Sequence, residues 1–343
     1  MAAITKERQA PPSGFRRWWN RSATTRTAWM YLAPAFIIMA VITFYPLFYQ
    51  VWMSTTDYGI KNLRFDSPSP NFVGLQNYSQ IFTGELPVAI ANFNFWNILA
   101  FDLIWTFTNV PIHVIIGVLI AVLLNVKGLW FKRLYRAIYI LPMVLPSLVI
   151  AVVWRNMFDS QYGAINQFLS TITHLFGGSP VTIRWMDQVD PVIGTFGTGL
   201  SLPLSYFALL FCNVWLGWPF MCIVATGALQ SIPGDLYEAA SIDGATSRQS
   251  FFHITVPLLR PAMVPAAVYG IVATFNLFNL IFLMSQGGPL RQTEILVTTA
   301  YRLVNEQRLY GVAAAFSVII FFVLLILTLI TNRVTKATER YDV

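Results

Sequence analysis

The residues best placed for chemistry lie in the polar stretch YEAASIDGATSRQSFFHITVPLLRP, from Tyr237 to Pro261. It holds several ionisable side chains between two long apolar runs, namely Glu238, Asp243, Arg248, His253 and Arg260. The sequence has no G-x-S-x-G, H-E-x-x-H, C-x-x-C or Walker phosphate-loop motif, and its three histidines are scattered. We therefore expect no catalytic residue, no metal site and no bound cofactor, and we expect this stretch to contact another protein.

The composition indicates a membrane protein. Of 343 residues, 56% are hydrophobic and 11% are charged, against about 25% charged residues in soluble domains. A soluble fold of this length needs a more polar surface. Because long apolar runs satisfy their own backbone in lipid only as helices or closed barrels, we predict an all-α integral membrane protein.

Six segments are long and apolar enough to cross about 30 Å of hydrocarbon. They are residues 29–53, 97–125, 134–157, 204–229, 262–286 and 309–332. The predicted organisation is a basic leader (1–28), a six-helix domain (29–333) that contains a polar loop (231–261), and a tail (334–343). We interpret the first segment as an uncleaved span, because its apolar run is too long for a signal peptide.

The distribution of Lys and Arg predicts the orientation. Residues 1–28, 126–136, 230–261 and 333–343 hold 15 of these residues, whereas 54–96, 158–203 and 287–308 hold 6. The positive-inside rule then places both termini and the Tyr237–Pro261 stretch in the cytoplasm. The excess positive charge is explained by topology, which excludes nucleic acid as the expected partner.

Few polar side chains fall inside the spans. Asp102 lies near the start of the second span, so it either reaches the interface or lines a translocation path. Asn276 and Asn279 share a helical face in the fifth span, where amides either join helices or hold a hydroxyl-rich solute. We also expect Gly217 and Pro219 to interrupt the fourth span and open a cavity there.

The polar stretch predicts a rigid knob made of two short helices. Pro233 and Asp235 suit the start of the first helix, Ala239 and Ala240 give it a small face, and Gly244 ends it. A second helix is expected over 247–252, and Pro257 and Pro261 are expected to stop it and turn the chain into the membrane.

The spacing of Glu238-Ala239-Ala240, Gly244, Ile254 and Pro257 resembles the signature of permease subunits of binding-protein-dependent ATP-binding cassette importers. Further segments are similar to the larger permease subunit of the maltose transporter family, over roughly 72–332. These are FVGLQNY (72–78), RAIYILPMVLPSLVIAVVWRNMF (136–158), YGAIN (162–166), SQGGP (285–289) and YGVAAAFSVII (310–320). We expect the compact six-span version of this subunit, without the large additional outer domain and the extra leading spans of the enteric maltose subunit.

The resemblance implies two sites. The residues that would couple the subunit to an ATPase are Glu238, Ala239, Ala240, Asp243, Gly244, Ala245 and Pro257. The residues that would line a sugar pocket are Leu216, Gly217, Phe220, Gly270, Thr274 and Leu277, to which the helical pattern adds Asn276. Thr274 and Leu277 stand where the maltose subunit has amides.

The resemblance also implies the partners. They are a second homologous permease, two ATPase subunits that bind ATP and Mg, an extracytoplasmic sugar-binding protein, and a di- or oligosaccharide, in a bacterial or archaeal inner membrane. One alternative is the same architecture for glycerol phosphate or a polyol. A second is a stand-alone channel or membrane enzyme, which would leave the Tyr237–Pro261 stretch without a role.

Overall fold

The computed structural model describes residues 14–335 except 65, 127 and 197–199, and the chain divides into two units at Met53–Ser54. The first unit is one run of helix: α1 (Gly14–Met39), a π-helical turn (Ala40–Phe44) and α2 (Tyr45–Ser54). The helix begins inside the predicted leader. Residues 1–13 of that leader, and residues 336–343 of the predicted tail, lie outside the described residues.

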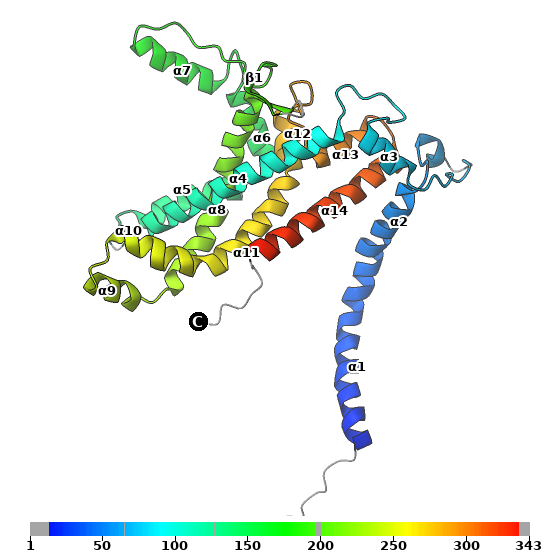
Figure 1. Cartoon of the computed structure of the whole chain (residues 1–343), viewed down its shortest axis with the longest axis horizontal. Helices are drawn as coiled ribbons and strands as arrows, with labels where there is room; N and C mark the ends of the chain where they lie inside the picture. The colour runs from blue at the N-terminus through cyan, green and yellow to red at the C-terminus, as the bar shows by residue number, and fades with distance from the viewer. Residues whose placement is uncertain (1–13, 65, 127, 197–199, 336–343) are drawn as a thin grey trace, which may run out of the picture. The chain divides into compact units, whose positions relative to one another are not determined.

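Four long helices make the centre of the second unit. α4 (Phe95–Leu124), α8 (Leu204–Ser231), α11 (Val256–Phe275) and α14 (Tyr310–Thr335) lie side by side, with α4 against α8 and α11, and α11 against α8 and α14 (Figure 1). Apolar side chains from these helices form the buried clusters of the bundle. The predicted second, fourth, fifth and sixth spans correspond to these helices.

Two of the predicted spans are interrupted. The third is a pair of helices, α5 (Lys132–Val144) and α6 (Ser147–Met157), which meet at 96°. The bend falls at Leu145, which precedes a proline and is therefore pushed into an extended conformation. The fifth breaks at Leu277, between α11 and α12 (Phe278–Met284). The described residues thus contain five helices long enough to span a membrane, or six when the bent pair counts as one.

Shorter elements cover the two ends of this bundle. One end carries a 3₁₀ turn (Ile60–Leu63), α3 (Gln76–Thr83), α7 (Ala164–Leu175), α13 (Leu296–Asn305) and an antiparallel hairpin of β1 (Pro191–Phe196) and β2 (Leu200–Pro203). The other end carries α9 (Asp235–Ile242), α10 (Ser247–Ser250) and a π-helical turn (Phe251–Thr255), which is continuous with α11 (Figure 1).

A buried amide holds the segment after α2 against α3. Asn77 is 5% exposed, and its Nδ2 donates to the carbonyls of Ser54 and Thr56, each at 2.8 Å. Nearby, the backbone N–H of Gly311, in the first turn of α14, donates to the Tyr58 carbonyl at 2.8 Å. One side chain therefore anchors the start of a long connecting segment.

We expect Asn77→Ala to lower the free energy of unfolding by about 2–4 kcal/mol, because it leaves two buried carbonyls without their amide donor. Asn305→Ala is the control, since that exposed side chain donates one hydrogen bond, to Tyr301, and its loss should cost less than about 1 kcal/mol. Thermal unfolding in detergent measures both. Equal loss in the two variants would contradict the anchoring role.

Candidate functional site

The polar loop is built around α9, whose end is closed by its own backbone. Gly244 has φ +79°, a conformation that favours glycine. The Gly244 N–H donates to the Ser241 carbonyl at 3.1 Å, and the Ala245 N–H donates to the Ala240 carbonyl at 2.9 Å. This is the hydrogen-bond pattern of a Schellman motif. The first helix of the loop therefore ends at Gly244, as predicted from the sequence.

A second set of contacts fixes α9 to the start of α11. Thr246 and Gln249 form a capping box for α10. The hydroxyls of Tyr237 on α9 and Thr255 are 2.9 Å apart, within hydrogen-bond distance. The prolines do not act as predicted, because the helix runs on through Pro257 and Pro261. Pro257 lies in the first turn of α11, where a missing N–H is tolerated. The loop is therefore joined to α11 through continuous helix.

The predicted coupling residues gather on the outside of this loop. Glu238, Ala239, Asp243, Gly244 and Pro257 are exposed, and Ala240 and Ala245 are half-buried. The loop also exposes apolar side chains, with Ile242 86% exposed. Among the described residues, no ion pair within 4 Å involves the carboxylates of this loop. The surface therefore offers small, apolar and acidic groups to a partner, and the coupling role of its residues stays a prediction.

The predicted sugar-pocket residues on α8 lie on an unbroken helix. The expected interruption at Gly217 and Pro219 is wrong, because α8 runs through both positions. Gly217 instead faces the imidazole of His113 on α4, whose ring atoms occupy the space that a Cβ would need. Leu216 and Phe220 are half-buried, and the Phe220 ring centroid is 5.4 Å from that of Tyr269.

The remaining pocket residues divide between the interior and the surface of the chain. Gly270 and Thr274 are buried, and the Thr274 carbonyl accepts a hydrogen bond from Trp105 Nε1 at 3.2 Å. Leu277 is half-buried at the break between α11 and α12. Asn276 ends α11, and its amide donates back to the Val272 carbonyl at 3.0 Å. Two of the predicted pocket residues are therefore buried and the others are half-buried, and their role in a sugar pocket stays a prediction.

Asn279 does not share a helical face with Asn276 as the pattern suggested, because the break at Leu277 separates them. Its Nδ2 donates to Ser147 Oγ at 3.1 Å, at the start of α6. This contact joins two helices, as the first of the two interpretations expected.

Two polar side chains near the predicted pocket residues were not predicted from the sequence. Tyr269 is 62% exposed on α11, one residue before the predicted Gly270. Asn213 is buried on α8, one turn before Gly217, and its Nδ2 has no hydrogen-bond partner among the described residues. The sequence did contain a signal for both, because each is a polar side chain within an apolar span.

Asp102 is fully buried and does not reach an interface. Its Oδ2 accepts a hydrogen bond from the Leu296 N–H at 3.0 Å, which satisfies a donor in the first turn of α13. Thr106, Asn109 and His113 follow at helical spacing on the same face of α4, and all are buried. Within this chain Asp102 is therefore a buried acceptor at the start of α13, which differs from both an interfacial carboxylate and one that lines a path.

Comparisons with known proteins agree with this architecture. The family described as "Binding-protein-dependent transport system inner membrane component" matches residues 113–340. The chain is 30% identical over 341 residues to the galactooligosaccharides transport system permease protein GanP of Bacillus subtilis (strain 168), covering 97% of this chain and 75% of that protein.

Two further relatives carry maltose in their names. The trehalose/maltose transport system permease protein MalF of Thermococcus litoralis is 29% identical over 313 residues, covering 91% of this chain and 94% of that protein. The maltose/maltodextrin transport system permease protein MalF of Escherichia coli (strain K12) is 32% identical over 303 residues, covering 84% and 54%.

A solved structure shows the same fold. It is a crystal structure of a bacterial ABC transporter involved in the import of the acidic polysaccharide alginate, with a TM-score of 0.73 at 19% identity. The match covers 94% of this chain and 100% of that one. The predicted all-α permease fold is confirmed.

Gly217→Ala should lower the free energy of unfolding by about 1–3 kcal/mol, because the new methyl group meets the His113 ring. Gly227→Ala on the same helix is the matched control, since a Cβ there meets nothing within 4 Å. It should raise stability by about 0.5–1 kcal/mol through helix propensity. Differential scanning fluorimetry compares them, and a Gly217→Ala protein as stable as wild type would contradict this packing.

Proposed function

Because the chain belongs to the family of binding-protein-dependent transport system inner membrane components, we propose that it is the permease subunit that forms the translocation path for a di- or oligosaccharide. The exposed and internally fixed loop around α9 carries this proposal, because a membrane-embedded subunit driven by another protein needs a rigid contact with it. The chain itself is a multi-pass membrane protein and not the ATPase.

The proposed partners follow from this role. A second homologous permease would complete the path, two ATPase subunits would bind ATP and Mg, and an extracytoplasmic binding protein would deliver the sugar. The Lys and Arg distribution supports an orientation with both termini and α9 in the cytoplasm. The ATPase would then contact Glu238, Ala239, Asp243 and Gly244, which are exposed.

The proposed mechanism is alternating access driven through α11. Closure of the ATPase pair moves α9, and the contact between Tyr237 and Thr255 passes that movement to the beginning of α11. Helix α11 carries Tyr269 and ends at Asn276. A shift of this helix therefore moves the residues proposed to contact the sugar, so that the path opens outward with ATP bound and returns after hydrolysis.

The proposed sugar contacts are the half-buried and exposed groups of α8 and α11. The aromatic pair Phe220 and Tyr269 offers ring faces and one hydroxyl, and Leu216 and Leu277 extend the apolar surface. Gly270 and Thr274 would support this surface from behind, because they are buried. The oligosaccharide names of the relatives support the substrate class, and no Lys or Arg stands among these residues to bind a phosphate.

We expect Glu238→Lys and Gly244→Asp each to abolish sugar uptake while the protein stays in the membrane, because Glu238 lies on the exposed surface of α9 and Gly244 closes the end of that helix. Glu85→Lys is the control, an exposed acid at the opposite end of the bundle. Uptake of labelled saccharide into proteoliposomes that contain all subunits measures the effect. Normal uptake by both loop variants would refute the docking role.

Tyr269→Ala should raise the KM for sugar uptake about tenfold, because stacking on an aromatic ring and one hydrogen bond together contribute on the order of 1–2 kcal/mol. Tyr162→Ala is the control, since Tyr162 is 80% exposed in the segment before α7. Unchanged kinetics in the Tyr269 variant would remove that residue from the proposed path.

A further inference from the structure

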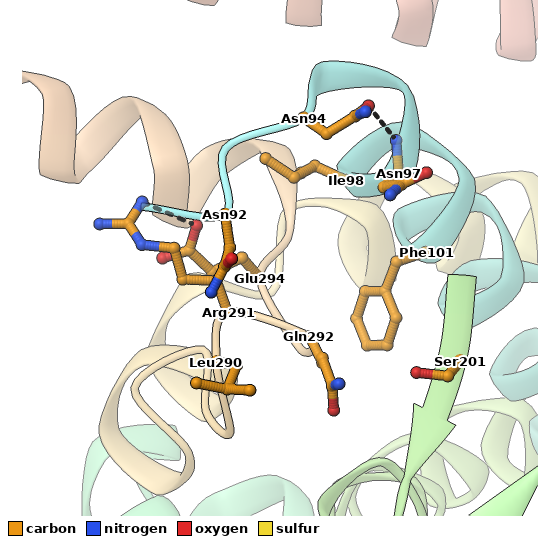
Figure 2. A pocket seen from close by; sticks show the side chains of 10 residues that line it. All are labelled: Asn92, Asn94, Asn97, Ile98, Phe101, Ser201, Leu290, Arg291, Gln292 and Glu294. Carbon is orange, nitrogen blue, oxygen red and sulfur yellow. Dashed lines mark hydrogen bonds and ion pairs between the residues drawn. The ribbon is translucent and has the colours of Figure 1, made fainter. Parts of the chain in front are cut away.

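A polar cavity lies at the end of the bundle opposite α9. Its volume is about 210 Å³, and it is bounded by the segment before α4, the first turns of α4, β2 and the segment before α13 (Figure 2). Amide side chains dominate its polar lining: Asn92, Asn94, Asn97 and Gln292. The proposed mechanism uses none of these residues.

The backbone around this cavity is held in unusual conformations. Asn92, Leu290 and Arg291 line it with φ values of +58°, +47° and +67°. Non-glycine residues rarely adopt such angles, and they do so where the surrounding structure fixes them. Asn94 Oδ1 also accepts a hydrogen bond from the Asn97 N–H at 3.1 Å, which caps α4.

A buried ion network forms one wall. Glu294 is 1% exposed, and its carboxylate is 2.7 Å from Arg302 Nε and 3.5 Å from Arg291 Nη1. Thr299 Oγ1 donates to it at 3.2 Å. Burial raises the pKa of the Glu294 carboxyl, and the two arginines act in the opposite direction. Since Arg291 is already paired with Glu294, the lining favours a neutral ligand over an anion or a metal ion.

Gln292 is one of the lining residues with a buried polar atom that has no hydrogen-bond partner among the described residues. Its Oε1 is buried and accepts no hydrogen bond from the described residues. A buried acceptor of this kind is destabilising unless water or a ligand donates to it. Gln292 lines the cavity together with Asn92, Asn94 and Asn97, so rotation of its side-chain amide would bring this acceptor to a ligand that carries hydroxyl groups.

We propose that this cavity is an outer subsite for a single neutral hexose ring of the transported saccharide, an inference that takes its substrate class from the proposed function. The amides can donate to and accept from neighbouring hydroxyls, and Ile98 and Leu290 supply apolar contact for ring carbons. The volume is below the ~300–1,000 Å³ of sites for drug-sized ligands, so it admits one ring and not a whole oligosaccharide.

Cysteine protection tests the subsite directly. Leu290→Cys places a thiol at the cavity. Leu63→Cys is the control, because Leu290 and Leu63 are almost equally exposed, at 57% and 56%. The native Cys212 and Cys222 are buried. The reconstituted transporter would be alkylated with N-ethylmaleimide in the presence of maltotriose, of galactobiose, or of glycine betaine as a solute without hydroxyl groups.

We expect either saccharide to slow alkylation at position 290 and not at position 63, with glycine betaine ineffective. Adding Gln292→Ala should raise the saccharide concentration for half-protection about fivefold, the factor that one hydrogen bond supplies. The Oε1 of Gln292 makes no hydrogen bond to another described residue that this variant would remove. Gln307→Ala, in the turn after α13, is the control.

The proposed subsite would be refuted if neither saccharide protected position 290. It would also be refuted if Gln292→Ala left the protection unchanged. Uptake of labelled saccharide by the same proteoliposomes is scored separately. Uptake without protection refutes the subsite and leaves the proposed function standing. Protection without uptake supports the subsite and counts against the proposed translocation role.

Discussion

The close packing of α4 on α8 is the contact on which the rest of the bundle depends. Gly217 of α8 faces His113 of α4, and Gly117 of α4 faces Met221 one turn further along, so the two helices run parallel. Small residues let helix backbones approach closely in lipid, where the hydrophobic effect does not drive helices together. α4 also contacts α11 through the hydrogen bond from Trp105 to the Thr274 carbonyl, and it contacts α13 through Asp102.

This arrangement supports the proposal that the α9 end of the second unit acts on its other end. Helix α11 is joined through its first turns to α9 and lies against α4, α8 and α14 along its length. In a close-packed bundle, an element held at several points moves as a unit or not at all. The break at Leu277 marks the point beyond which α12 can follow a different course.

Much of this fold could be predicted from the sequence, because length and apolar composition identify membrane spans, and because Gly244 and Asp235 have local effects on helix ends. The breaks within the predicted third and fifth spans were harder to predict. Pro146 gave a local signal for the bend after α5, whereas the break at Leu277 has no Gly or Pro beside it from which it could be predicted. The burial of Asp102 and the orientation of Gly270 likewise depend on neighbours that are distant in sequence. Motif spacing could therefore indicate a coupling surface, whereas the lining of a pocket could not be read from periodicity alone.

The central claim is that this chain works as one subunit of a larger machine driven through the α9 loop. Gentle solubilisation from the native membrane, followed by mass spectrometry of the proteins that remain bound, tests it most directly. Recovery of an ATPase together with a second, homologous permease is the predicted result. Recovery of the chain alone, or as a homo-oligomer without an ATPase, would contradict the account.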